Sequence, residues 1–149
     1  MGDRLCPQRL QRLQSVLNAA SRVIFHLRSY GRITDALVTL HWLRVAERIK
    51  YKIALLTFRV LHGSAPPYLG PLAPVRSLPG RRSLRSTGTT RLLVPSAKRS
   101  TIGDRAFPVA VPKTWNALPE DVTSSLSEYT LRRQLKTWLF KKSFPDIII

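Results

Sequence analysis

The chain has 149 residues, of which 44% are hydrophobic, so it is long enough to form one domain around a buried core. Its 25 Lys and Arg residues against 8 Asp and Glu give a formal net charge of +17 at pH 7, which predicts a polyanionic partner, nucleic acid first. One cysteine excludes an internal disulfide, and no apolar run reaches the ~18 residues of a membrane span, so we expect an intracellular chain, with the nucleus as a compatible compartment and no membrane partner.

Three apolar patterns in the first half of the chain predict helices. The first pattern covers residues 7–29. In the second, Thr34 is placed to cap a short helix that ends at Leu40. The third predicts a helix from Ala46 to Leu61 at the centre of the core, because apolar residues cover so much of its circumference, and Gly63 is expected to end it. The apolar stripe of the first helix consists of Leu10, Leu13, Val16, Leu17, Ala20, Val23, Ile24 and Leu27.

Residues 74–100 form a basic arm that contains seven Lys or Arg residues and no acid. Strand-like runs around Leu84 and Leu92 predict a minor β-hairpin in this arm, with a mobile loop that orders on a partner as the alternative. Arginines interleaved with Ser, Thr and Gly suit contacts to phosphates, and the arm has no aromatic residue on which a base could stack. The predicted nucleic-acid-binding residues are Arg82, Arg85, Arg91, Lys98 and Arg99. A basic, disordered linker is the competing structural interpretation of the same residues.

The block "TIGDRAFPVAVPKTWNALPEDV", residues 101–122, is best interpreted as architecture that holds the root of the arm. Pro112 suits the first turn of a short helix, and Glu120 and Asp121 suit the start of another. We expect a paired or capping contact in the Asp-Arg dipeptide and packing of the apolar side chains against the two long helices. The predicted structural residues are Gly103, Asp104, Arg105, Phe107, Trp115 and Leu118.

A last helix is predicted over about residues 126–142, with Ser124 or Ser127 as its cap. The residues expected to face the core are Tyr129, Leu131, Leu135, Trp138 and Leu139. The residues expected on its basic outer face are Arg132, Arg133, Lys136, Lys141 and Lys142. Together the patterns predict a mainly α fold of about five helices with the minor β-hairpin, in a single domain over residues 1–149.

The residues that usually carry enzyme chemistry are sparse and scattered. One cysteine and three dispersed histidines offer no zinc spacing, and no glycine-rich phosphate loop is present. The only adjacent acids are Glu120 and Asp121, at a predicted helix start. We therefore predict no catalytic residue, no metal site and no cofactor.

Four segments, in the same order along the chain, resemble a known family. They are "LHWLRVAERIKYKIALLTFRVLHGSAPPYL", "RSLRS", "LLVPSAKRSTIGDRAFPVAVPKTWNALPEDV" and "YTLRRQLKTWLF". From about Leu10 to Phe140 the chain resembles the C-terminal region, after the palm, of reverse transcriptases from LINE-type non-LTR retrotransposons. It departs from the family pattern at "FPVAVPKTW", where "FSVAAPxLW" is commoner, and it has no pair of adjacent aspartates like the one that binds the catalytic metal. The family is an RNA-directed DNA polymerase, but the resemblance implies that this chain lacks the polymerase core and the endonuclease.

The resemblance and the charge together predict a non-catalytic fragment that holds the backbone of RNA, DNA or an RNA–DNA duplex. Two other interpretations stay open. A decayed retroelement reading frame without selected function predicts poor folding or aggregation. A basic protein-interaction module predicts weak binding to nucleic acid and retention of acidic proteins.

Overall fold

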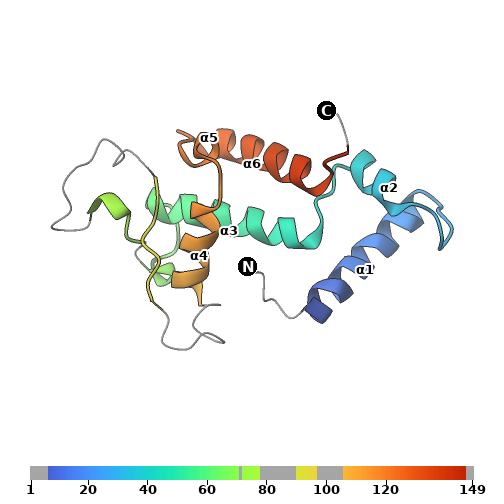
Figure 1. Ribbon diagram of the computed structural model, residues 1–149, viewed down its shortest axis with the longest axis horizontal. Coiled ribbons are helices and arrows are strands. Elements are labelled where there is room, and N and C mark those ends of the chain that lie inside the picture. Colours follow the sequence, from blue (N-terminus) through green and yellow to red (C-terminus); the bar gives the residue numbers. More distant parts are fainter. Residues whose placement is uncertain (1–6, 71, 78–89, 97–105, 147–149) are drawn as a thin grey trace. The chain divides into compact units, whose positions relative to one another are not determined.

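The computed structural model describes residues 7–70, 72–77, 90–96 and 106–146, and these residues form a mainly helical fold (Figure 1). They contain six α-helices and no strand, which confirms the predicted fold class. The chain divides into two compact units, one made of Met1–Ile49 with Lys136–Ile149 and the other of Lys50–Leu135. Two helices, α3, Val45–Leu61, and α6, Glu128–Ser143, each have residues in both units. The division therefore does not test the predicted single domain, which stays a prediction.

The first unit contains α1, Pro7–Ile24, and α2, Ile33–Thr39, with the start of α3 and the end of α6. The Gln14 side chain accepts a hydrogen bond from the Val45 N–H at 2.8 Å, which ties the first turn of α3 to α1. The helix predicted to be capped by Thr34 instead begins at Ile33, after an extended Arg32 that makes no side-chain cap. The buried hydrophobic residues of this unit are Ala36, Leu37, Leu43, Leu139, Phe140 and Phe144.

Helix α1 is shorter than predicted, and its apolar stripe is largely exposed. It ends at Ile24 and not at residue 29, because the chain turns through His26, whose φ of +50° is left-handed and cannot continue a helix. In its apolar stripe, the side chains of Val16 and Val23 are 68% and 73% exposed. The buried side chain of this helix is Ser21, whose hydroxyl donates to the Leu17 carbonyl at 2.8 Å.

The second unit contains the rest of α3, the start of α6 and two further helices, α4, Phe107–Asn116, and α5, Glu120–Thr123. It also contains two 3₁₀ turns, Pro67–Leu69 and Val75–Ser77. Gly63 ends α3 with a φ of +67°, as predicted. Helix α5 spans Glu120–Thr123 and has both predicted acids in its first turn. Ser127 caps α6, because its hydroxyl accepts the Thr130 N–H at 3.2 Å. The buried hydrophobic residues are Ala54, Phe58, Leu92, Val109, Val111, Trp115, Val122, Leu131 and Leu135.

Helix α4 spans Phe107–Asn116, so the prediction that Pro112 opens it is wrong. Its first turn instead contains Pro108, at a position where the missing N–H would have no partner within the helix. Pro112 lies inside the helix and is fully buried. Its ring therefore contributes to the core, at the expense of one backbone hydrogen bond in the helix.

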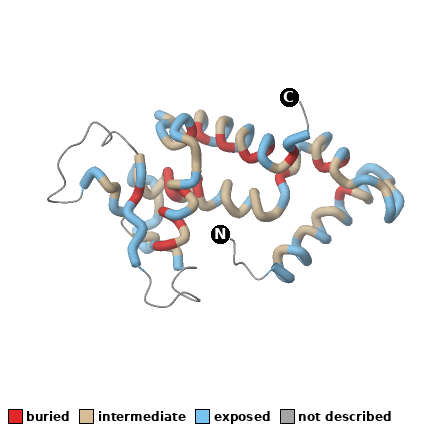
Figure 2. Tube along the Cα trace, viewed as in Figure 1, coloured by how far each residue is buried: buried red, intermediate tan, exposed pale blue. Residues whose placement is uncertain are grey.

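Helix α6 buries one side along its length, as Figure 2 shows. Leu131, Leu135 and Leu139 are fully buried, as predicted. The prediction that Tyr129 faces the core is wrong, because this side chain is 75% exposed in the first turn, and Trp138 is half-buried. The five basic residues predicted on the outer face are all exposed.

An ion pair joins α3 to α6 within the second unit. Arg59 donates to both carboxylate oxygens of Glu128, at 2.8 and 3.2 Å, and Arg132 contacts the same carboxylate from the next turn of α6. The hydrogen bonds from Arg59, with the added positive charge of Arg132, lower the pKa of the Glu128 carboxyl below its usual value of 4.5. The partners are about one-third exposed, so the pair contributes little stability.

The E128Q variant is expected to melt slightly below the wild type at pH 7, and the difference should vanish in acid. Because the pKa of Glu128 is lower in the folded state, its contribution is complete above pH 4.5 and is lost as pH falls through the folded-state value. Melting temperatures of both proteins, measured from pH 7 to about 3, test this. The control variant is D146N, which removes an exposed carboxylate near the C-terminal end of the described chain. A difference between E128Q and wild type that persisted in acid would contradict the assignment.

Candidate functional site

The best-defined site of the second unit is the place where the basic arm meets α4. The last two residues of α4, Trp115 and Asn116, hold the arm through side-chain hydrogen bonds, and we call them the α4 brace. The amide of Asn116 accepts from the Leu92 N–H at 2.9 Å and donates to the Leu92 carbonyl at 2.8 Å. The indole N–H of Trp115 donates to the Thr90 carbonyl at 2.9 Å. One amide side chain thus replaces the neighbouring strand that Leu92 would need in a sheet.

The opposite edge of the same segment pairs with the chain before the arm. Pro74 and Leu92 form an isolated antiparallel bridge, in which the Val75 N–H donates to the Arg91 carbonyl at 2.9 Å and the Leu93 N–H to the Ala73 carbonyl at 2.8 Å. In the described part of the chain, the partner of Leu92 is therefore Pro74. The predicted hairpin is not seen, and its other run, around Leu84, lies outside the described residues.

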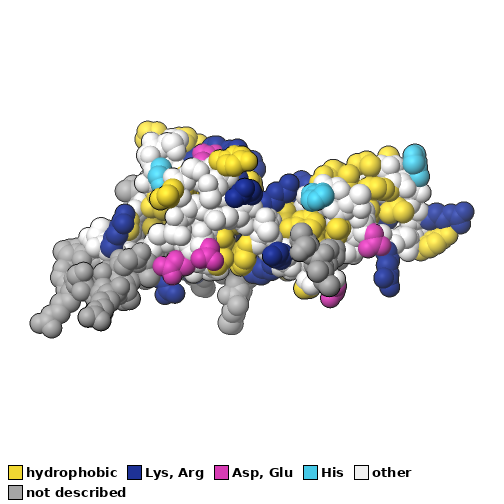
Figure 3. All heavy atoms as spheres, turned by 90° about the horizontal axis from the view of Figure 1, so that it is seen from above, with side chains coloured by type: hydrophobic (Ala, Val, Ile, Leu, Met, Phe, Trp, Pro, Cys, Tyr) yellow, Lys and Arg dark blue, Asp and Glu magenta, His cyan; other side chains and the backbone are white. Residues whose placement is uncertain are grey.

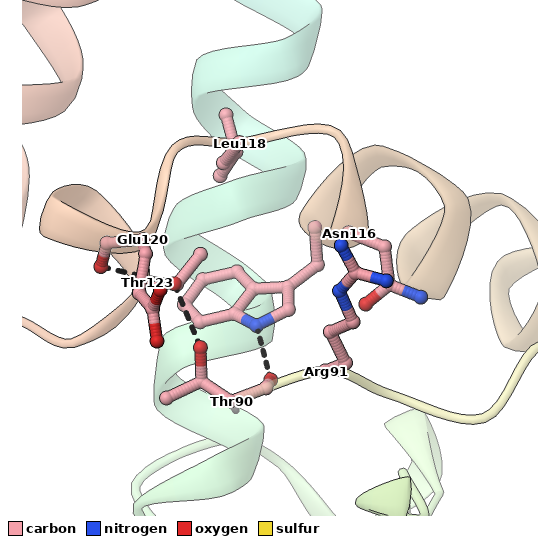
Figure 4. A pocket seen from close by; sticks show the side chains of 7 residues that line it. Thr90, Arg91, Asn116, Leu118, Glu120 and Thr123 are labelled. Atoms are coloured by element: carbon pink, nitrogen blue, oxygen red, sulfur yellow. Dashed lines mark hydrogen bonds between the residues drawn. The ribbon is translucent and has the colours of Figure 1, made fainter. Parts of the chain in front are cut away.

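Arg91 lies between two anchored neighbours and is itself exposed. In Figure 4 its side chain lies beside that of Asn116, and Glu120 and Thr123 lie on the opposite side of the pocket. The pocket has a volume of about 110 Å³. Its lining residues are Thr90, Arg91, Trp115, Asn116, Leu118, Glu120 and Thr123. The pocket therefore presents the guanidinium of Arg91 and the carboxylate of Glu120 at the surface, next to residues that are held by hydrogen bonds.

The polar groups on the floor of the pocket are engaged with one another. The Thr90 hydroxyl donates to the Thr123 hydroxyl at 2.7 Å, and the Thr123 hydroxyl donates to the Glu120 carbonyl at 3.2 Å. This chain of bonds connects the arm to α5, as the brace connects it to α4. These contacts position the arm against α5, because each hydroxyl proton is already donated to an oxygen of the protein.

The structure places only part of the predicted site. Of the predicted nucleic-acid-binding residues, Arg91 is described, and Arg82, Arg85, Lys98 and Arg99 lie outside the described residues. Of the predicted structural residues, Trp115 is 1% exposed and Phe107 and Leu118 are half-buried. Gly103, Asp104 and Arg105 also lie outside the described residues.

Sequence reasoning missed the roles of Asn116, Thr90 and Thr123. The available signal for Asn116 was its place at the end of an apolar helix beside a tryptophan, where a polar side chain is half-buried and needs a partner. Thr90 and Thr123 are 33 residues apart, and no sequence pattern predicts the hydrogen bond between them.

Two features are absent from the described residues. Among the residues that the structure describes, no group of three or more His, Cys, Asp or Glu side chains is arranged to hold a metal ion. Likewise, none of the helices found there has the length and apolar character needed to cross a membrane. No protein-family model matches the sequence, and neither a curated protein nor a solved structure does.

Proposed function

We propose that this chain is a non-catalytic fragment of a retrotransposon-derived reverse transcriptase that binds the phosphate backbone of RNA or of an RNA–DNA duplex. The binding surface is the basic arm, residues 74–100, and its anchored arginine is Arg91. Support comes from the net charge of +17 and from the basic composition of the arm. On the face drawn in Figure 3, Lys and Arg side chains lie among hydrophobic ones. The proposal places the protein inside the cell, with the nucleus as a compatible compartment.

The observation that carries the proposal is the anchoring of Arg91. The carbonyl of Thr90 and both backbone polar groups of Leu92 are bonded to α4, and the Arg91 carbonyl is bonded to Val75. The backbone on both sides of the exposed guanidinium is therefore held before any ligand arrives. An arginine on an anchored backbone loses less backbone conformational entropy on binding a phosphate than an arginine on a free chain.

The test compares two triple variants that lower the net charge equally. One is R82A/R85A/R91A, in the arm, and the other is R9A/R12A/K52A, at exposed positions on α1 and α3. Binding of each protein to a labelled RNA hairpin and to an RNA–DNA duplex is measured from about 50 to 300 mM salt, where counterion release is visible. The arm variant is expected to lower the magnitude of the salt slope by about three, because three phosphate contacts are lost, while the control keeps the wild-type slope.

Two outcomes would contradict the proposal. Equal losses in the two variants would mean that binding follows total charge and not the arm. A folded wild-type protein that binds neither the RNA hairpin nor the RNA–DNA duplex would contradict the proposed function. Circular dichroism of each sample shows whether the proteins compared are folded.

A further inference from the structure

Part of the apolar stripe of helix α1 is left exposed by its own unit. Leu13, Val16, Ala20 and Val23 are spaced three, four and three residues apart, which is the spacing of a heptad seam. Leu13, Val16 and Val23 are 56%, 68% and 73% exposed, and Ala20 is also exposed. Ile24, 50% exposed, extends the same face, and at 100° per residue all five lie within an arc of about 100°.

The adjoining side of α1 is already packed within the unit. Leu10 and Leu17 are half-buried, Ser21 is fully buried, and α1 contacts α2. Gln14, on the same side, bonds the first residue of α3. The exposed seam is therefore surplus to the packing of α1 within its unit.

The charges of α1 indicate the kind of partner that fits. The helix contains no acid, and of its three arginines Arg12 borders the seam, Arg9 continues the line of the seam toward the N-terminus, and Arg22 lies on the opposite side of the helix. With Leu13 and Ala20 at the a positions, Arg12 occupies a g position, where a charge selects the opposite charge on the facing helix. The small side chain of Ala20 leaves room in the seam for a larger side chain such as Leu from the partner.

We propose that the exposed seam of α1 docks one amphipathic helix of a partner protein, whose apolar seam is flanked by Asp or Glu. Two other occupants fit less well. A second copy of this chain would bring two charges of +17 together. A lipid surface is served by aromatic side chains at the interface, and the seam itself is entirely aliphatic. This inference is independent of the proposed function, because it concerns a different unit from the anchored end of the arm.

The test uses the full chain and a synthetic heptad peptide with Leu at a and d and Glu at e and g. Such a peptide repels itself and is free to pair with a basic helix. Wild-type protein is expected to bind it with an affinity that falls with salt, and V16D/V23D to bind at least about tenfold more weakly. The matched control is Q8D/Q11D, which adds the same two charges to the same helix at exposed positions off the seam, and it should stay within about threefold of wild type.

Each remaining outcome decides against the proposal. Absence of peptide binding, or equal loss in the two variants, would mean that the seam is not the docking surface. Tighter binding to phosphatidylserine-containing vesicles than to the peptide would assign the face to a membrane. Dimerisation of the wild type that V16D/V23D abolishes, measured by sedimentation, would assign it to a second copy. Because Val16, Val23, Gln8 and Gln11 are all exposed, both double variants should keep the wild-type melting temperature.

Discussion

Replacing Trp115 with Ala is expected to destabilise the chain by about 4 kcal/mol, a large share of the total stability of a small protein. The side chain is 1% exposed and is the largest fully buried side chain among the residues that the structure describes. Its removal leaves a cavity in the core of the second unit, and it also leaves the Thr90 carbonyl without the indole donor at 2.9 Å. Both losses fall on the same contact between α4 and the arm.

Urea unfolding followed by circular dichroism measures this loss, and two further variants separate its causes. Trp115→Phe keeps most of the apolar volume but loses the N–H donor, so it should fall between wild type and Trp115→Ala. Trp138→Ala, which truncates a half-buried indole on α6, should cost clearly less. If Trp115→Ala unfolded at the wild-type urea concentration, the buried role of this residue would be wrong.

Replacing Asn116 with Ala is expected to cost about 2 to 4 kcal/mol, although the substitution removes no apolar packing. The amide makes two hydrogen bonds to the backbone of Leu92. Leu92 is only 2% exposed, so water has little access to the N–H and the carbonyl that would be left unpaired. The cost arises because two backbone groups remain buried without partners.

Asn116→Asp separates the two bonds of the brace. A carboxylate can still accept from the Leu92 N–H, but it cannot donate to the Leu92 carbonyl and would face that oxygen with a negative charge. At neutral pH this variant should therefore be clearly less stable than wild type, despite its nearly identical shape. Gln11→Ala, which truncates an amide side chain at an exposed position on α1, is the control and should change the unfolding free energy by less than about 0.5 kcal/mol. Wild-type stability of both Asn116 variants would show that the brace does not hold the arm.

The local character of the chain could be predicted from the sequence. The long helices are accounted for by their apolar periodicity, Gly63 by its tolerance of a left-handed turn, and Ser127 by its capping oxygen. Leu131, Leu135 and Leu139 were placed in the core because their four-residue spacing aligns them on one face of a helix. These features depend on neighbours within a few positions, and the charge that motivates the proposed function requires no structure at all.

The residue pattern alone thus accounts for the mainly helical class, the approximate helix bounds and the basic character of the arm. The partner of Leu92 and the two bonds of Asn116 depend on tertiary packing, because those contacts join residues 18 and 24 positions apart, respectively. The exposure of the seam of α1 depends on it too. An apolar stripe of helical period indicates that a face is suited to burial, but whether another element covers that face depends on how the rest of the chain packs.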